Sequence, residues 1–155
     1  VLDFGCGTGL LTERMAQTAN QILALDSSDK MISVLESKKL RNVDVLATSL
    51  SKASIDANVS LQVKFDLIVA SSVCAFLPDY EETLQLLKSL LKPNGFFVQW
   101  DWLKSDVGSD FGLTKEIVES AYGQSGLEVL SITRAFSLGN NEDSMQVLMG
   151  VAKNT

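Results

Sequence analysis

The stretch Val1-Leu2-Asp3-Phe4-Gly5-Cys6-Gly7-Thr8-Gly9 decides the fold. Its first four residues, apolar apart from Asp3, predict the end of a buried strand, and Leu10–Asn20 has the spacing of an amphipathic helix. Glycine has no Cβ, so the loop between them can turn sharply and let a ligand lie against bare backbone. Amides at the start of the helix add donors and a partial positive charge. The segment therefore predicts a site for a nucleoside-containing cofactor.

The spacing of the glycines separates the possible cofactors. A dinucleotide pattern, G-x-G-x-x-G, would need a glycine where this chain has Leu10, and the loop instead reads G-x-G-x-G through Gly5, Gly7 and Gly9. The carboxylate of Asp3 would repel a pyrophosphate, but it suits the ammonium and sulfonium charges of S-adenosylmethionine. A phosphate-binding P-loop is excluded because no Gly-Lys-Ser/Thr follows.

The rest of the chain alternates short apolar runs with helical patterns, which is typical of a parallel sheet covered on both faces. Helices are expected after Ser27 or Ser28 and over Thr114–Ser125, and residues 49–64 are expected to form a loop with a short helix. The turn-rich segment 139–143 predicts a closing antiparallel hairpin. The further strands that we expect are Ile22–Leu25, Val43–Ala47, Phe65–Ser71, Phe96–Trp102, Leu127–Ser137 and Ser144–Ala152.

Two helices carry more specific expectations. In the helix after Ser28, Met31 is expected to face the sheet together with its apolar neighbours. Asp79, followed three residues later by Glu82, resembles a capping box and opens a helix with Leu91 on its inner side. The segment Lys92-Pro93-Asn94-Gly95 is expected to end that helix.

Composition limits the class of protein. With 155 residues and 46% apolar content we expect one domain, and the apolar runs fall well short of the roughly 20 residues that span a bilayer. The net charge of −6 without a basic stripe argues against direct binding of nucleic acid. No metal site is expected, because the chain has no histidine and Cys6 and Cys74 lack metal spacing. No targeting peptide is visible, and a reducing, cytoplasmic location is the default expectation.

In these features the chain resembles the class I S-adenosylmethionine-dependent methyltransferases, in particular small-molecule enzymes with a D-x-G-C-G-T-G first motif. Residues 23–31 are similar to the second motif of that family, which implies that Asp26 binds both ribose hydroxyls. Residues 65–72 and 90–96 are similar to its fourth-strand motif and to the turn before its fifth strand. The matches follow one another in order over nearly the whole chain.

The resemblance implies a Rossmann-like, doubly wound α/β sheet of seven strands in the order 3-2-1-4-5-7-6, with strand 7 antiparallel. It also implies that residues 1–155 form a methyltransferase domain that begins within its first strand, because relatives carry upstream helices that cover the cofactor. The implied function is transfer of a methyl group from S-adenosylmethionine, with S-adenosylhomocysteine as product, to an unidentified small-molecule acceptor. The sulfonium already activates the methyl group, so positioning alone can suffice, and no catalytic residue is assigned.

The expected cofactor site departs from the family in one respect. Many relatives have an aspartate after the third strand that binds the adenine amino group, whereas this chain offers only the uncharged hydroxyl of Ser49. The complete set of expected cofactor-binding residues is Asp3, Phe4, Gly5, Cys6, Gly7, Gly9, Asp26, Ser27, Met31, Ser49, Leu50 and Ser71.

Alternatives stay open for the function and for single residues. A methyltransferase-like domain can serve as a partner subunit or hold the cofactor without turnover, and a nicotinamide-dependent reductase would bind NADH instead. Asp26 can be a plain helix cap. Phe76 can contact the cofactor or substrate, or merely pack.

Five residues in or after the fifth strand and the two cysteines have alternative roles as well. Trp100 and Trp102 can form the wall of a substrate pocket or pack in the core. Asp101 is a candidate base near the substrate, whereas Asp106 and Asp110 fit a solvated loop. Cys6 and Cys74 are expected to lie near one another as buried packing residues without chemistry.

Overall fold

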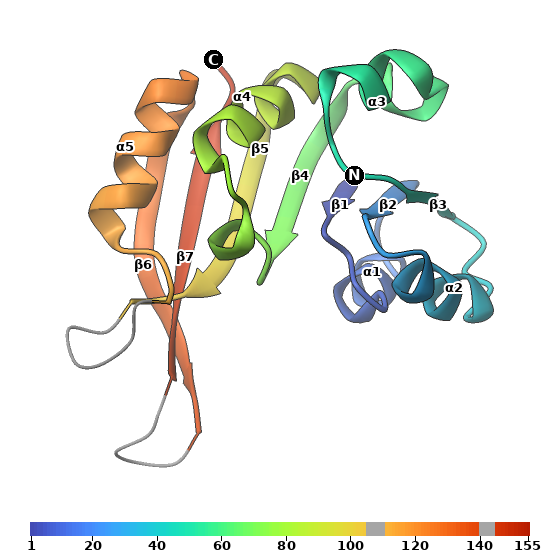
Figure 1. The fold of residues 1–155 in the computed structure, drawn as a ribbon, viewed down its shortest axis with the longest axis horizontal. Helices are drawn as coiled ribbons and strands as arrows, with labels where there is room; N and C mark the ends of the chain where they lie inside the picture. The colour runs from blue at the N-terminus through green and yellow to red at the C-terminus, as the bar shows by residue number, and fades with distance from the viewer. Residues whose placement is uncertain (105–110, 140–144) are drawn as a thin grey trace.

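A single seven-stranded sheet organises the computed structural model, which describes residues 1–104, 111–139 and 145–155 (Figure 1). The strand order is β3-β2-β1-β4-β5-β7-β6, and β7 runs antiparallel to both of its neighbours, as the sequence predicts. The strands are β1 (Leu2–Phe4), β2 (Ile22–Asp26), β3 (Val43–Ala47), β4 (Phe65–Ser71), β5 (Leu91–Trp102), β6 (Glu128–Leu138) and β7 (Met145–Lys153). The helices are α1 (Leu10–Met15), α2 (Asp29–Ser37), α3 (Lys52–Ala57), α4 (Tyr80–Leu90) and α5 (Lys115–Ser125), with single 3-10 turns η1 (Val59–Leu61) and η2 (Cys74–Phe76).

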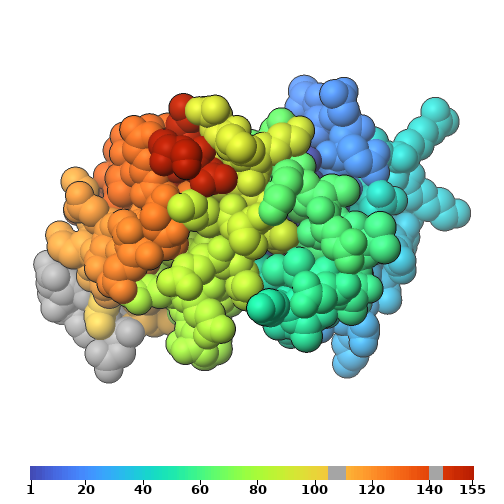
Figure 2. All heavy atoms as spheres, turned by 90° about the horizontal axis from the view of Figure 1, so that it is seen from above, coloured from blue at the N-terminus to red at the C-terminus, as the bar shows by residue number. Residues whose placement is uncertain are grey.

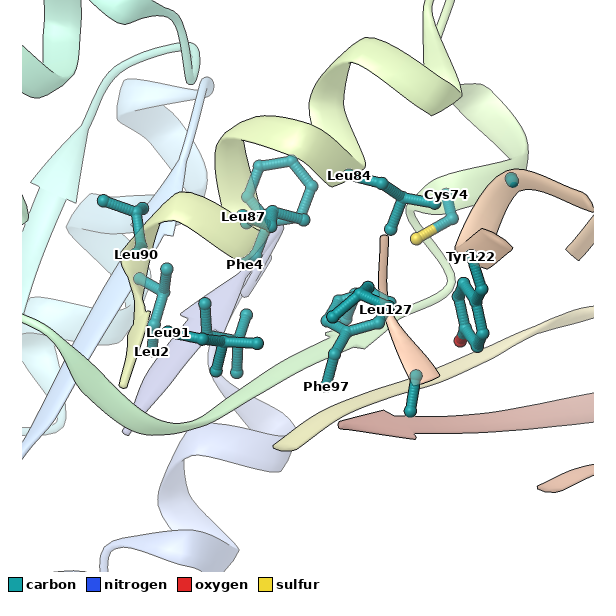
Figure 3. Close-up of a cluster of buried hydrophobic side chains, with 14 of the residues drawn as sticks. Leu2, Phe4, Cys74, Leu84, Leu87, Leu90, Leu91, Phe97, Tyr122 and Leu127 are labelled. Atoms are coloured by element: carbon teal, nitrogen blue, oxygen red, sulfur yellow. The ribbon is translucent and has the colours of Figure 1, made fainter. Parts of the chain in front are cut away.

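Alternating side chains place a core on each face of the sheet. Along β2, Leu23 and Leu25 join a large cluster of buried residues with α4 and α5, whereas Ala24 joins a smaller cluster with α2. Figure 3 shows the large cluster, to which α4 contributes Leu84, Leu87 and Leu90 and β1 contributes Leu2 and Phe4. Each fully buried leucine of this kind stabilises the fold by roughly 1.5–3 kcal/mol. Within the described ranges, no helix has the length and apolar character that a membrane crossing requires.

Helix α1 is shorter than the sequence predicts. The apolar spacing suggested a helix as far as Asn20, but α1 ends at Met15 and the chain continues in turns. The side-chain amide of Asn42, just before β3, donates to the carbonyl oxygens of Ala16 (2.9 Å) and Ala19 (2.7 Å). A distant side chain therefore satisfies two carbonyl groups beyond the end of α1, of which that of Ala16 would have bonded to Asn20 in the longer helix.

The junction of α4 and β5 also differs from the prediction. Asp79 is the N-cap of α4, but its side chain makes no capping hydrogen bond, so the predicted capping box does not form. Leu91 is buried as expected, but it begins β5, and the segment predicted as a turn belongs to that strand. The C-terminal residues lie against this segment (Figure 2). There Asn154 exchanges backbone hydrogen bonds with Asn94 and Gly95. Pairing with the distant C-terminus thus extends the strand.

Several other expectations from the sequence are confirmed. Residues 49–64 contain the short helix α3 followed by η1, and the last two strands pair as an antiparallel hairpin. Most of their turn-rich linker lies outside the described residues, as do Asp106 and Asp110.

Strand β5 presents two different faces. Phe97, Gln99 and Asp101 are fully buried toward α4 and α5. Trp100 and Trp102, which alternate with them, are half-buried and point to the opposite side of the sheet. The strand therefore buries polar side chains beneath its helices while its tryptophans remain partly in solvent.

Close packing between α5 and β7 gives a first prediction. A Cβ at Gly150 would collide with the hydroxyl of the fully buried Tyr122, whereas a Cβ at Gly123 in α5 would meet nothing within 4 Å. We expect G150A to lower the free energy of unfolding by about 1–3 kcal/mol through overpacking. G123A is expected to raise it by about 0.5 kcal/mol through helix propensity. Urea denaturation of both variants measures this, and equal effects of the two would contradict the packing described.

Candidate functional site

The glycine loop between β1 and α1 has backbone angles that favour glycine at each alternate position. The φ angles of Gly5, Gly7 and Gly9 are 69°, 55° and 79°. A Cβ at Gly5 would collide with Val73, and one at Gly9 with Leu35, so these two glycines permit close packing. A Cβ at Gly7 would meet nothing within 4 Å. The middle glycine thus leaves open space over bare backbone, as a ligand cradle requires.

The carboxylate of Asp26, at the end of β2, fixes this loop. Its Oδ2 accepts a hydrogen bond from the Gly7 amide, and its Oδ1 accepts one from the Ser28 amide, both at 2.9 Å. Helix α2 is capped by Ser28, whose Oγ accepts from the Met31 amide, so Asp26 is not the helix cap. Each oxygen of Asp26 has capacity for a further donor, such as a ribose hydroxyl.

Two cavities share the glycine loop. The first, of about 660 Å³, extends from β1 and β2 past the end of β3 to α4, and the second, of about 490 Å³, lies over the loop and the start of α1. Both are bordered by Gly5, Asp26, Val73 and Phe76, so they adjoin. The first contains the expected site residues Phe4, Gly5, Asp26, Ser27, Ser49 and Leu50, and the second contains Asp3, Gly5, Cys6, Gly7, Asp26, Met31 and Ser71.

Two expected site residues lie differently from the prediction. Gly9 lines neither cavity, because it packs against Leu35 behind the loop. Met31 does not face the sheet: 42% of it is exposed, and it borders the second cavity. The apolar period of α2 is continued by Ile32 and Leu35, which are both buried.

Asp3 borders the second cavity as a buried carboxyl group. The Thr12 hydroxyl donates to its Oδ2 at 2.5 Å. Burial raises the pKa of Asp3 from 3.8 to about 6, the Thr12 hydrogen bond opposes that rise, and the nearby Asp26 carboxylate adds to it. A cation entering this cavity would find a carboxyl group that ionises readily beside it.

The two cysteines offer no nucleophile at neutral pH. Burial, and then the carboxylates of Asp3 and Asp26, raise the pKa of the Cys6 thiol to about 12. Burial likewise raises the pKa of the Cys74 thiol. The expectation of buried packing is confirmed, but the thiols belong to separate core clusters on opposite faces of the sheet rather than to one neighbourhood.

The segment after β4 contributes Val73, which the sequence did not indicate as a site residue, and Phe76, for which contact with cofactor or substrate was one of two open alternatives. Val73 and Phe76 border both cavities, and the Phe76 ring lies 4.8 Å from that of Phe111 between centroids. Their sequence has no recognisable motif. The available signal was their place after a parallel strand, because ligands of open α/β sheets bind beyond the carboxyl ends of the strands.

Three candidates from β5 do not reach the cavities. Trp100 and Trp102 lie on the opposite face, border neither of the two cavities and belong to neither core cluster. Asp101 is only 1% exposed and is surrounded by protein donors, which argues against a role as a base in contact with substrate.

Residues 2–97 match the family model described as methyltransferase domain. The chain belongs to this family. Its sheet order and glycine loop agree with the membership that the sequence motifs implied.

This methyltransferase domain is also similar to individual curated proteins and to solved structures. It is 32% identical over 111 residues to an uncharacterized methyltransferase of Schizosaccharomyces pombe, and 28% identical over 98 residues to a ubiquinone biosynthesis O-methyltransferase of Haemophilus ducreyi. These matches cover 67% and 61% of the chain, but only 39% and 42% of those proteins. A solved S-adenosylmethionine-dependent methyltransferase of Aquifex aeolicus has the same fold, with a TM-score of 0.78 at 18% identity over 99% of this chain and 81% of that one.

The raised pKa of Asp3 predicts a pH dependence of stability. The folded methyltransferase domain holds the proton on Asp3 more tightly than the unfolded chain does, so this group stabilises the fold below pH 3.8 and loses that contribution as pH rises to about 6. Wild type is expected to lose this stabilisation between pH 4 and pH 7, whereas D3N has no such group to titrate. The free energy of unfolding of D3N minus that of wild type is therefore expected to rise by on the order of 2 kcal/mol over this range. Urea denaturation across this range checks it, with D44N, a change at an exposed carboxylate, as control. Parallel curves for D3N and wild type would refute the assignment.

Proposed function

We propose that this domain binds S-adenosylmethionine across the two adjoining cavities and transfers its methyl group to a small-molecule acceptor. The observation that carries the proposal is the Asp26 carboxylate, which holds the Gly7 amide at the junction of the cavities. Adenine and ribose would occupy the first cavity, and the methionine portion would lie over the glycine loop.

The residues present fit such a ligand. Apolar side chains of the first cavity, including Phe4, Leu50 and Leu77, suit the faces of an adenine ring, and Ser49 offers a hydroxyl for its edge. The open side of Gly7 suits the close approach of the ligand to bare backbone. Asp3 supplies the negative charge that an ammonium group needs.

The chain's own contribution to the reaction would be positioning. The bound cofactor supplies a methyl group made electrophilic by its positive sulfur. The glycine loop and Asp26 would fix the direction in which that methyl group points, and alignment with a nucleophile accounts for much of the barrier in such transfers. We therefore assign no catalytic base.

A small-molecule acceptor is supported by the relatives and by the rim of the second cavity. One relative is named for ubiquinone biosynthesis. At the rim, Leu10, Met31 and Phe76 are 72%, 42% and 62% exposed, so apolar side chains surround the place where an acceptor would approach. Such a rim favours an acceptor with hydrocarbon or aromatic surface.

Substitution of Asp26 tests the cofactor site. D26A removes the ribose acceptor and releases the Gly7 amide, so we expect the Kd for S-adenosylhomocysteine to rise more than tenfold, as for the loss of a charged hydrogen-bonding partner. D44A removes an exposed carboxylate from the neighbouring strand and is expected to leave the Kd unchanged. Isothermal titration calorimetry gives both values. Tight binding of NADH, or D26A with wild-type affinity, would defeat the cofactor assignment.

The Asp3 carboxyl group predicts a pH dependence of this binding. The ligand's ammonium group favours ionised Asp3 and lowers its pKa from about 6, so binding releases a proton at acidic pH. We expect the affinity for S-adenosylhomocysteine to weaken about tenfold between pH 7.5 and pH 5, and the dependence to be much smaller in D3N. Calorimetry in buffers of different ionisation enthalpy counts the proton. No proton release from wild type would remove Asp3 from the proposed site.

Methyl transfer itself needs a separate measurement. Incubation of the protein with cofactor carrying a labelled methyl group and a small-molecule extract separates an enzyme from a domain that only holds the ligand. The proposal expects label in an extracted small molecule, with little label when D26A replaces the wild type. Binding without any transfer would leave a ligand-holding domain as the function.

A further inference from the structure

A connected series of buried polar side chains lies beneath the η2 turn, outside both cavities. The hydroxyls of Tyr80 in α4 and Tyr122 in α5 donate to Oε1 of Gln99, the latter at 2.9 Å. Nε2 of Gln99 donates to Oδ2 of Asp101 at 3.0 Å. Oδ1 of Asp101 accepts from the backbone amide of Ala75 at 3.1 Å. The series thus joins two helices and β5 to the turn.

The direction of each hydrogen bond in this series is determined. An ionised carboxylate can only accept, so the amide nitrogen of Gln99 must face Asp101, and the oxygen of Gln99 then accepts from the two tyrosine hydroxyls. Burial raises the pKa of Asp101 to about 6, while the hydrogen bonds from Ala75, Cys74 and Gln99 oppose the rise. At neutral pH the group is therefore a buried anion held by protein donors.

The Ala75 amide lies where the turn meets the site. It is an early donor of a 3-10 turn, a position that has no partner within the turn itself. On either side of it, Val73 and Phe76 border both cavities, and Val73 packs against Gly5. The hydrogen bond at Ala75 therefore lies between the two residues through which this turn borders the cavities.

We propose that Asp101 is a positioning residue that holds the η2 turn against the glycine loop, so that cofactor affinity depends on its hydrogen bond to Ala75. This inference rests on the proposed function. It assigns Asp101 a role through Val73 and Phe76 and not through contact with the ligand. The separate bond from the Ser72 amide to the Trp100 carbonyl (2.7 Å) keeps the turn attached to β5 when Asp101 is changed.

The size of the effect follows from the fraction of time that the turn spends in its closed position, because the apparent Kd is the intrinsic Kd divided by that fraction. Ala75 and Gln99 donate to different oxygens of Asp101, and Cys74 is a further donor. In D101N an NH2 group replaces one of these two oxygens, so at least one of the donors then faces another donor instead of an acceptor. We expect the Kd for S-adenosylhomocysteine to rise about tenfold in D101N, which corresponds to a turn that rests against the glycine loop for about a tenth of the time.

A charge swap provides the matched rescue. In Q99E/D101N, the carboxylate at position 99 accepts from both tyrosines and from the amide at position 101, whose own oxygen again accepts from Ala75. We expect affinity in this double variant within about twofold of wild type. Y122F removes a buried hydroxyl from the same series without touching the turn, so it is expected to lower stability but leave the Kd unchanged.

Calorimetry and amide hydrogen exchange distinguish the outcomes. Faster exchange of the Ala75 amide in D101N, restored in the double variant, supports the proposal together with the affinities. Wild-type affinity in D101N, no rescue in Q99E/D101N, or a loss in Y122F as large as in D101N would overturn it.

The proposal can still be tested if D101N does not fold, or if the wild-type protein does not bind S-adenosylhomocysteine. If D101N fails to fold, hydrogen exchange of the Ala75 amide is measured in the wild-type protein alone. Exchange as fast as in a free loop would overturn the proposal, and protection of this amide from exchange would support it. Absence of S-adenosylhomocysteine binding by wild type would refute the proposed function and the affinity claim, while the exchange data would still decide whether Asp101 holds the turn.

Discussion

The hydrogen bonds of Asp26 are the interactions on which the site depends. One carboxylate joins the glycine loop of β1 to the residues that follow β2, through the amides of Gly7 and Ser28. Hydrogen bonds to a charged group contribute roughly 1.5–3 kcal/mol each, about twice the value for neutral partners. The loop can therefore keep its left-handed turns without a ligand, and binding would need to order little backbone.

The parallel pairing around β1 provides the frame for these bonds. Only three residues long, β1 pairs with β2 on one side and β4 on the other, and its alternation sends Leu2 and Phe4 into the large core and Asp3 to the opposite face. Burial of Asp3 carries an electrostatic cost, which the Thr12 hydroxyl reduces. The same short strand thus anchors the hydrophobic core and delivers an acidic group to the second cavity.

Features encoded by neighbouring residues could be predicted from the sequence, whereas features that depend on distant partners could not. The loop of Gly5 and Gly7 followed from a local motif, and the strand order was implied by the family resemblance that such motifs carry. The early end of α1 depends on Asn42, which is far along the chain, and no local pattern reveals that partner. In the same way, the burial of Asp101 depends on donors such as the Ala75 amide, which belongs to another element. The alternation of polar and apolar residues along β5 does not reveal this, because the polar face of such a strand could equally face solvent.

The position of the two tryptophans has a consequence for spectroscopy. Both lie on β5, half-buried, on the face of the sheet away from α4 and α5. Indole emission shifts to shorter wavelength when water leaves the ring, so intrinsic fluorescence from this protein would report first on whatever shields that side of the sheet. Filling of the two cavities, which Trp100 and Trp102 do not border, would need a different optical probe.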